Sequence, residues 1–257
     1  MKKLFSFLLL IILVFVLGTS VADEISFRNV VWGIDAVTAC DTLNKGGLSL
    51  YLSSLDEYTS TVATYRLRNI LSSSMYGNVS GEQGLTTFAL EFPNGLKVAG
   101  YEPVSIYVWF VYRPVEGELV YDDKSTALYA GMYSFTPENL EGVYHDLQEK
   151  LVSVYGEYAG EGGQELIESI CGEKTIAWSM IEPEQTVSVW ETEESYLFLV
   201  SNKMPEDADP AFYMDNIMIV YAAKDSDKWI DEALAAQKKT NERLEKEKYG
   251  DGDTSGL

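Results

Sequence analysis

The chain has 257 residues, with 40 acidic side chains against 19 basic ones and a formal net charge of −21 at pH 7. A protein with this charge repels phosphate backbones, so nucleic acid is not expected as a partner. The length suffices for a domain with its own hydrophobic core, and the single histidine excludes multi-histidine metal sites.

The first 22 residues have the three parts of a cleavable secretory signal peptide. Two lysines precede an apolar run at residues 4–17, and the small residues Ser20 and Ala22 follow, as signal peptidase requires. As a helix this run covers about 21 Å, which is less than the ~30 Å hydrocarbon core of a bilayer. We therefore expect cleavage between Ala22 and Asp23, a secreted or extracytoplasmic location, and no stable membrane insertion after cleavage. Because both lysines leave with the leader, the formal charge falls from −21 to −23.

After the leader, residues 25–30 alternate like a short strand, and residues 35–44 are predicted to form a helix closed by a Lys-Gly-Gly signal. Cys40 lies in this helix, and Cys171 is the other cysteine of the chain. An exported protein can join such a pair in a disulfide, which we regard as possible for Cys40 and Cys171. Two buried free thiols fit the sequence equally well.

The middle and later parts of the chain are rich in strand patterns. Strands are expected at residues 85–92, 96–101, 104–113, 127–135, 175–181, 186–191, 195–200 and 216–222. Residues 104–113 are apolar at even and at most odd positions, which is typical of a central strand covered on both faces. Residues 156–163, rich in Gly and Glu, are expected to be a loop and a possible seam between subdomains.

The clearest helix is predicted at residues 137–155. Thr136 supplies a capping hydroxyl, Pro137 occupies the first helical position, and the apolar side chains recur at helical spacing. Leu147 and Leu151 belong to this apolar face and should be buried against the sheet.

The end of the chain differs from the rest, because residues 237–257 carry many charges and few large apolar side chains. This segment is predicted to be a charged helical tail, partly disordered and dispensable for folding, so the globular domain should span residues 23–236. The fold class that follows is α+β: a twisted antiparallel sheet with a few packed helices, plus an exposed C-terminal helical extension.

No motif of a nucleophilic enzyme or of a nucleotide-binding loop is present in the sequence. His145, the single histidine, should point away from the apolar face of its helix, so we expect it to be exposed and not catalytic. A pair of carboxylates suited to glycoside hydrolysis cannot be recognised among so many acids. A carbohydrate-active hydrolase that uses paired carboxylates is therefore the alternative function, and no cofactor or metal is expected.

Aromatic residues are the one enrichment that could carry function. Tyr107 and Trp109 share one strand face, and Tyr129 and Tyr133 share a face of the next predicted strand. On an open face they would bind sugars, peptides or partner proteins by stacking. If helix 137–155 covers that face they are core residues, which is the usual state of a strand apolar on both sides.

Several short motifs resemble those of a loose group of uncharacterised exported bacterial proteins. The motifs are F-R-x-x-x-W-G at Phe27 to Gly33, Tyr155-Gly156 at a helix end, Trp178, Tyr221 and the terminal Gly256-Leu257. The resemblance implies export and a helix followed by a twisted antiparallel sheet, and it implies no activity. This chain departs from the pattern at Ile34-Asp35, where a capping Ser or Thr is usual.

These features together predict an exported, non-enzymatic binding or envelope-interaction protein. Its partner would be an unknown exported protein or a glycan.

Overall fold

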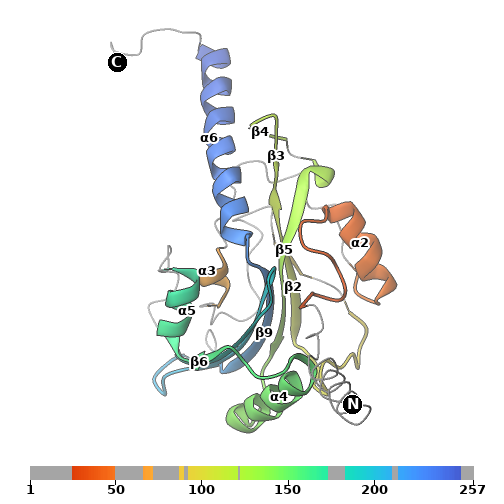
Figure 1. Ribbon diagram of the computed structural model, residues 1–257, viewed down its shortest axis with the longest axis vertical. Helices are drawn as coiled ribbons and strands as arrows, with labels where there is room; N and C mark the ends of the chain where they lie inside the picture. Colours follow the sequence, from red (N-terminus) through yellow and green to blue (C-terminus); the bar gives the residue numbers. More distant parts are fainter. Residues whose placement is uncertain are drawn as a thin grey trace, which may run out of the picture.

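The computed structural model describes residues 25–49, 66–71, 87–89, 92–120, 122–172, 183–209 and 214–249. The cleavage site at Ala22 and Asp23, the strand expected at 175–181 and the last residues of the tail lie outside the described residues. The described part of the chain has an α+β fold, in which helices surround a curved antiparallel sheet (Figure 1).

The main sheet has seven strands among the described residues, in the order β1-β2-β5-β9-β8-β7-β6, and every neighbouring pair is antiparallel. The strands are β1 (Thr87–Ala89), β2 (Ser105–Tyr112), β5 (Thr126–Phe135), β6 (Gly160–Gly162), β7 (Glu184–Glu191), β8 (Ser195–Lys203) and β9 (Asn216–Ala223). The predicted strands at 104–113, 127–135, 186–191, 195–200 and 216–222 are thus confirmed. Strands β2 and β5 are buried along almost their whole length, as their two-sided apolar pattern indicates.

Three expectations about strands were wrong. Residues 25–30 form no strand, because Arg28 and Asn29 have positive φ values and turn the chain between Phe27 and Val30. Residues 96–101 form no strand, because Ala99 and Gly100 have φ values of 51° and 93° and place a tight turn in the middle of the segment. Within the expected loop 156–163, residues 160–162 pair with β7 as an edge strand. Glycine at Gly160 and Gly162 leaves room there for the side chain of Leu166, which would contact any added Cβ at 3.2–3.3 Å.

The helices follow the predicted pattern with small shifts at their starts. The helix α2 (Ala36–Lys45) is capped by Asp35, whose carboxylate accepts a 3.0 Å hydrogen bond from the Thr38 N–H and so replaces the usual Ser or Thr. The helix α4 (Leu140–Tyr155) begins three residues later than expected, because Asn139 is its N-cap and Thr136 is not. As predicted, Leu147 and Leu151 are buried. Shorter helices are α3 (Leu67–Leu71), α5 (Gln164–Cys171) and the 3₁₀ turn η2 (Asp123–Ser125).

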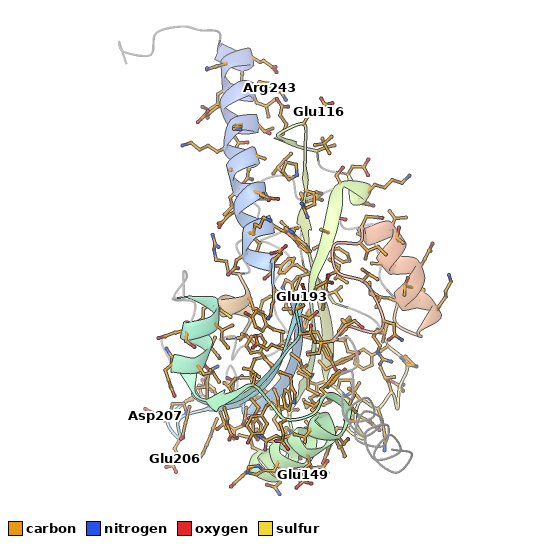
Figure 2. The ribbon with its side chains drawn as sticks, in the orientation of Figure 1. Glu116, Glu149, Glu193, Glu206, Asp207 and Arg243 are labelled. Carbon is orange, nitrogen blue, oxygen red and sulfur yellow. The ribbon has the colours of Figure 1, made fainter. Side chains whose placement is uncertain are left out.

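The last helix, α6 (Ser226–Tyr249), projects past the sheet beside a small hairpin of β3 (Pro114–Val115) and β4 (Glu118–Leu119) (Figure 1). Its docked part is longer than the sequence indicates. Thr240 is buried and accepts a 3.2 Å hydrogen bond from the Leu119 N–H, and Arg243 lies 3.1 Å from Glu118. Beyond this contact the helix is exposed as expected, and Figure 2 shows Arg243 and Glu116 at this end of the molecule.

The remaining helices pack on different strands of the sheet. Helix α4 packs on β8 and β9, α5 on β7, α3 on β9 and α2 on β5. None of the described helices has the length and apolar character needed to cross a bilayer.

Candidate functional site

The aromatic residues proposed as an open ligand face are buried instead. Tyr107, Trp109, Tyr129 and Tyr133 are only 6%, 2%, 1% and 4% exposed. They also do not share one face, because Tyr107 lies opposite Met132 and Tyr133 lies opposite Ile106 in the β2–β5 register. The open-face alternative is therefore wrong, although the covering helix α4 packs mainly on β8 and β9.

The other singled-out side chains are separated from one another. His145 is exposed on α4, as predicted. Cys40 and Cys171 form no disulfide, and the helices that carry them, α2 and α5, lie on opposite sides of the molecule (Figure 1). Burial raises the pKa of the Cys171 thiol to about 12, so this thiol is an inert part of the core at neutral pH.

A hollow of the described surface lies between the N-terminal segment, the turn at residues 97–101 and the end of α4. Its volume is about 680 Å³, which is in the range of small-molecule sites. Among the described residues, its lining includes the cations Arg28 and Lys97 and the phenols Tyr133, Tyr155 and Tyr221, but no Asp, Glu, His or Cys. We call it the Arg28 pocket.

The N-terminal wall of the Arg28 pocket is anchored on the sheet by aromatic packing. The Phe27 ring is fully buried, with its centroid 5.1 Å from the Tyr133 ring and 5.9 Å from the Tyr221 ring. It fits because position 131 is glycine, where an added Cβ would lie 2.4 Å from the Phe27 ring. The Trp32 indole N–H donates a 2.7 Å hydrogen bond to the Ser195 hydroxyl and fixes the other end of the wall.

Backbone strain is concentrated at this pocket. Arg28 and Asn29, at the centre of the turn that bridges Phe27 to Val30, have φ values of 55° and 59°. Together with Ala99 in the opposite turn, they are three of the four non-glycine residues with positive φ in the described part of the chain. Each such residue costs on the order of 1 kcal/mol, and conformations of this kind cluster at binding sites.

The turn that carries Lys97 is held against α4 by a polar network. The Tyr101 hydroxyl donates a 2.7 Å hydrogen bond to Asp146, and the Lys150 ammonium donates both to Asp146 and, at 2.9 Å, to the Ala99 carbonyl. The hydrogen bonds from Lys150 and Tyr101 hold the pKa of Asp146 below its ordinary value of 3.8. Lys150 is therefore ion-paired with Asp146, and Lys97 is the lysine that lies at the pocket rim.

Arg28 differs from the other arginines of the chain in its charge partner. The sequence has five arginines, and four of them, Arg66, Arg68, Arg113 and Arg243, form ion pairs with carboxylates. Arg28 forms none with any residue that the structure describes, and its Nε donates a 2.6 Å hydrogen bond to the Tyr133 hydroxyl. In so acidic a chain, a half-buried arginine that forms no ion pair with any described carboxylate is the unusual feature of this site.

The tyrosines of the Arg28 pocket are neutral hydrogen-bonding groups at physiological pH. Burial raises the pKa of Tyr133 to about 12 and the pKa of Tyr221 well above 10. Tyr221 is also hydrogen-bonded to Tyr155. These phenols therefore orient a ligand or a neighbouring side chain and are poor proton donors or acceptors in catalysis.

A second hollow, of about 380 Å³, lies beside His145 and is lined by three acids, Glu141, Glu184 and Asp215. In the part of the chain that the structure describes, no group of three or more His, Cys, Asp and Glu side chains could hold a metal ion. Further acids at the same end of the molecule, Glu149, Glu206 and Asp207, are labelled in Figure 2. The acidic surface and the Arg28 pocket are thus chemically distinct regions.

Sequence reasoning had singled out part of the Arg28 pocket, but not as a site. Four residues from the motifs that carry the resemblance, Arg28, Trp32, Tyr155 and Tyr221, all line it. Lys97 was missed, and its only local signal was its place just after a Pro-Asn-Gly turn. Trp178, another aromatic residue of those motifs, lies outside the described residues.

Comparison of the chain with protein-family models, with curated proteins and with solved structures finds no match.

Proposed function

We propose that this chain is an exported, non-enzymatic binding protein whose ligand presents an anionic group to the Arg28 pocket. The observation that carries the proposal is that Arg28, unlike the other four arginines, forms no ion pair with a described carboxylate. Export rests on the predicted signal peptide, and the partner would be met outside the cytoplasm.

The geometry of Arg28 favours an oxyanion. Its Nε donates to Tyr133, which fixes the plane of the guanidinium. Among the described residues the two terminal amines have no ion-pair partner, so a ligand can accept hydrogen bonds from them. Lys97, on the facing rim, adds a second positive charge. A charge-assisted hydrogen bond in such a partly buried place contributes about 1.5–3 kcal/mol.

The chemistry of the lining supports binding over catalysis. Acid–base and nucleophilic mechanisms draw mostly on carboxylates, histidine, cysteine or activated hydroxyls. None of the described residues that line the Arg28 pocket has a carboxylate, imidazole or thiol, and the raised pKa values of Tyr133 and Tyr221 keep both phenols protonated. A rigid anion-binding pocket needs none of these reactive groups.

Native mass spectrometry tests this proposal. The protein, purified from the exported fraction of cells that make it, should carry a small bound molecule that Arg28→Gln loses. Arg243→Gln is the matched control, because it removes an arginine from the exposed part of α6. Equal retention of the bound molecule by wild type and by Arg28→Gln would overturn the proposal.

The alternative, a carbohydrate-active hydrolase with paired carboxylates, would use the second hollow, where Glu141, Glu184 and Asp215 come together. Its test is release of a chromophore from aryl glycosides by wild type and by Glu184→Gln. Turnover that depends on Glu184 and survives Arg28→Gln would establish the alternative in place of the binding function.

A further inference from the structure

The rim of the Arg28 pocket is apolar as well as cationic. Val31 from the N-terminal wall and Val154 from the end of α4 both line it, and they are 68% and 52% exposed. They are two of the seven large apolar side chains left exposed in the described part of the chain. Val30 and Val98 continue this apolar lining. An inorganic anion seated at Arg28 would leave Val31 and Val154 in water, whereas an apolar chain attached to the anion would cover them.

The charge of the whole protein limits the charge of the ligand. With a net charge of −21 the chain repels anions at long range, and this repulsion grows with each negative charge on the ligand. Arg28 and Lys97 are the two cationic side chains among the described residues that line the pocket. A singly charged group is therefore favoured over a phosphate monoester, and the planar carboxylate matches the two terminal amines of a guanidinium.

From these observations we infer the chemical class of the ligand: an apolar monocarboxylate, with its carboxylate between Arg28 and Lys97 and its apolar chain against Val31 and Val154. The inference rests on the binding function proposed above and specifies the ligand of that same pocket. Two sources offer this chemistry, a free fatty acid and a peptide whose C-terminal residues are apolar.

Isothermal titration at pH 7 with a panel of probes tests the inference. The probes are decanoate, decanol, decyl phosphate, inorganic phosphate, and an acetylated Ala-Val-Leu peptide with either a free or an amidated C-terminus, all below micelle concentrations. Either decanoate or the free-acid peptide should bind, and the better of the two identifies the source. Decanol and the amidated peptide should bind at least tenfold more weakly, because they lack the charge that Arg28 recognises.

Variants locate the binding. Arg28→Gln should weaken binding of the carboxylate probe at least tenfold, and Val154→Ser should weaken it severalfold. Val120→Ser is the matched control, because Val120 is a comparably exposed valine, 42% exposed, that does not line the pocket. It should leave the affinity unchanged.

The outcomes separate the inference from the proposed function. Binding of phosphate or decyl phosphate that depends on Arg28, without binding of either carboxylate probe, would overturn the inference and leave the proposed function standing. Carboxylate binding that is equal in wild type and Arg28→Gln would overturn it as well. If no anionic probe responds to Arg28→Gln, the proposed function fails together with the inference.

Discussion

Replacing Gly131 by alanine tests how the wall of the Arg28 pocket is attached to the sheet. The new Cβ would lie 2.4 Å from Cγ and 2.5 Å from Cδ2 of Phe27, far inside van der Waals contact. The Phe27 ring cannot move aside easily, because it is fully buried between Tyr133 and Tyr221. Overpacking of this kind costs about 1–3 kcal/mol, which exceeds the 0.5–1 kcal/mol that alanine gains over glycine in a strand.

Thermal unfolding followed by circular dichroism measures the effect. At roughly 3 °C per kcal/mol for a domain of this size, Gly131→Ala should lower the Tm by about 3–9 °C. It should also weaken ligand binding, because the turn that presents Arg28 must shift with Phe27. In a Phe27→Ala background the ring is absent, so adding Gly131→Ala should cost nothing further and could restore up to about 1 kcal/mol.

The double-mutant comparison makes the result decisive. A Gly131→Ala protein that is as stable as wild type would show that Phe27 does not lie on Gly131. An equal loss of stability with and without the Phe27 ring would point to strain in β5 itself and would refute the packing argument.

Three further predictions concern parts of the molecule outside this wall. Asp146→Asn should lower the free energy of unfolding at pH 7, as measured by urea titration. Because the folded-state pKa of Asp146 is lowered, its carboxylate stabilises the protein above pH 3.8, and the difference in stability between wild type and variant should vanish as the pH falls below that value. Truncation after Ala236 should lower the Tm by a few degrees. It removes the buried Thr240 and leaves the Leu119 N–H of β4 without its hydrogen-bond acceptor, which costs about 1–3 kcal/mol. An unchanged Tm would show that residues 237–257 are dispensable for folding. When the protein is denatured without reductant and treated with an alkylating reagent, mass spectrometry should find both Cys40 and Cys171 modified. A protein in which neither cysteine is modified would contain a disulfide between them.

Local sequence patterns were enough to place most of the elements. Strand β2 and helix α4 have strong periodicity over many residues, so their existence followed from side-chain spacing alone. The edge strand β6 could not be found in this way, because Gly-Glu-Gly has no strand pattern and forms a strand only by pairing with β7. The turn at Ala99 was missed because alanine rarely adopts positive φ.

The candidate site depended even more on the tertiary structure. Alternation along β2 and β5 showed which aromatic residues share a face within each strand, but not how the two strands are aligned. Their register puts Tyr107 and Tyr133 on opposite faces of the sheet. Arg28 and Lys97 lie far apart in the sequence. They line the same pocket because Phe27 packs on Gly131 and Lys150 holds the second turn.

The arginine side chains themselves give the most direct test of the account. A nitrogen–proton correlation spectrum of the Nε–H groups should contain five arginine signals, one for each arginine of the chain. The signal that Arg28→Gln removes is the Arg28 signal. Decanoate, sulfate and inorganic phosphate are then added in turn, and at least one of these anions should shift the Arg28 signal and leave the other four in place. If the Arg28 signal stays unchanged with every anion, or if all five signals move together, the Arg28 pocket is not the binding site of this protein.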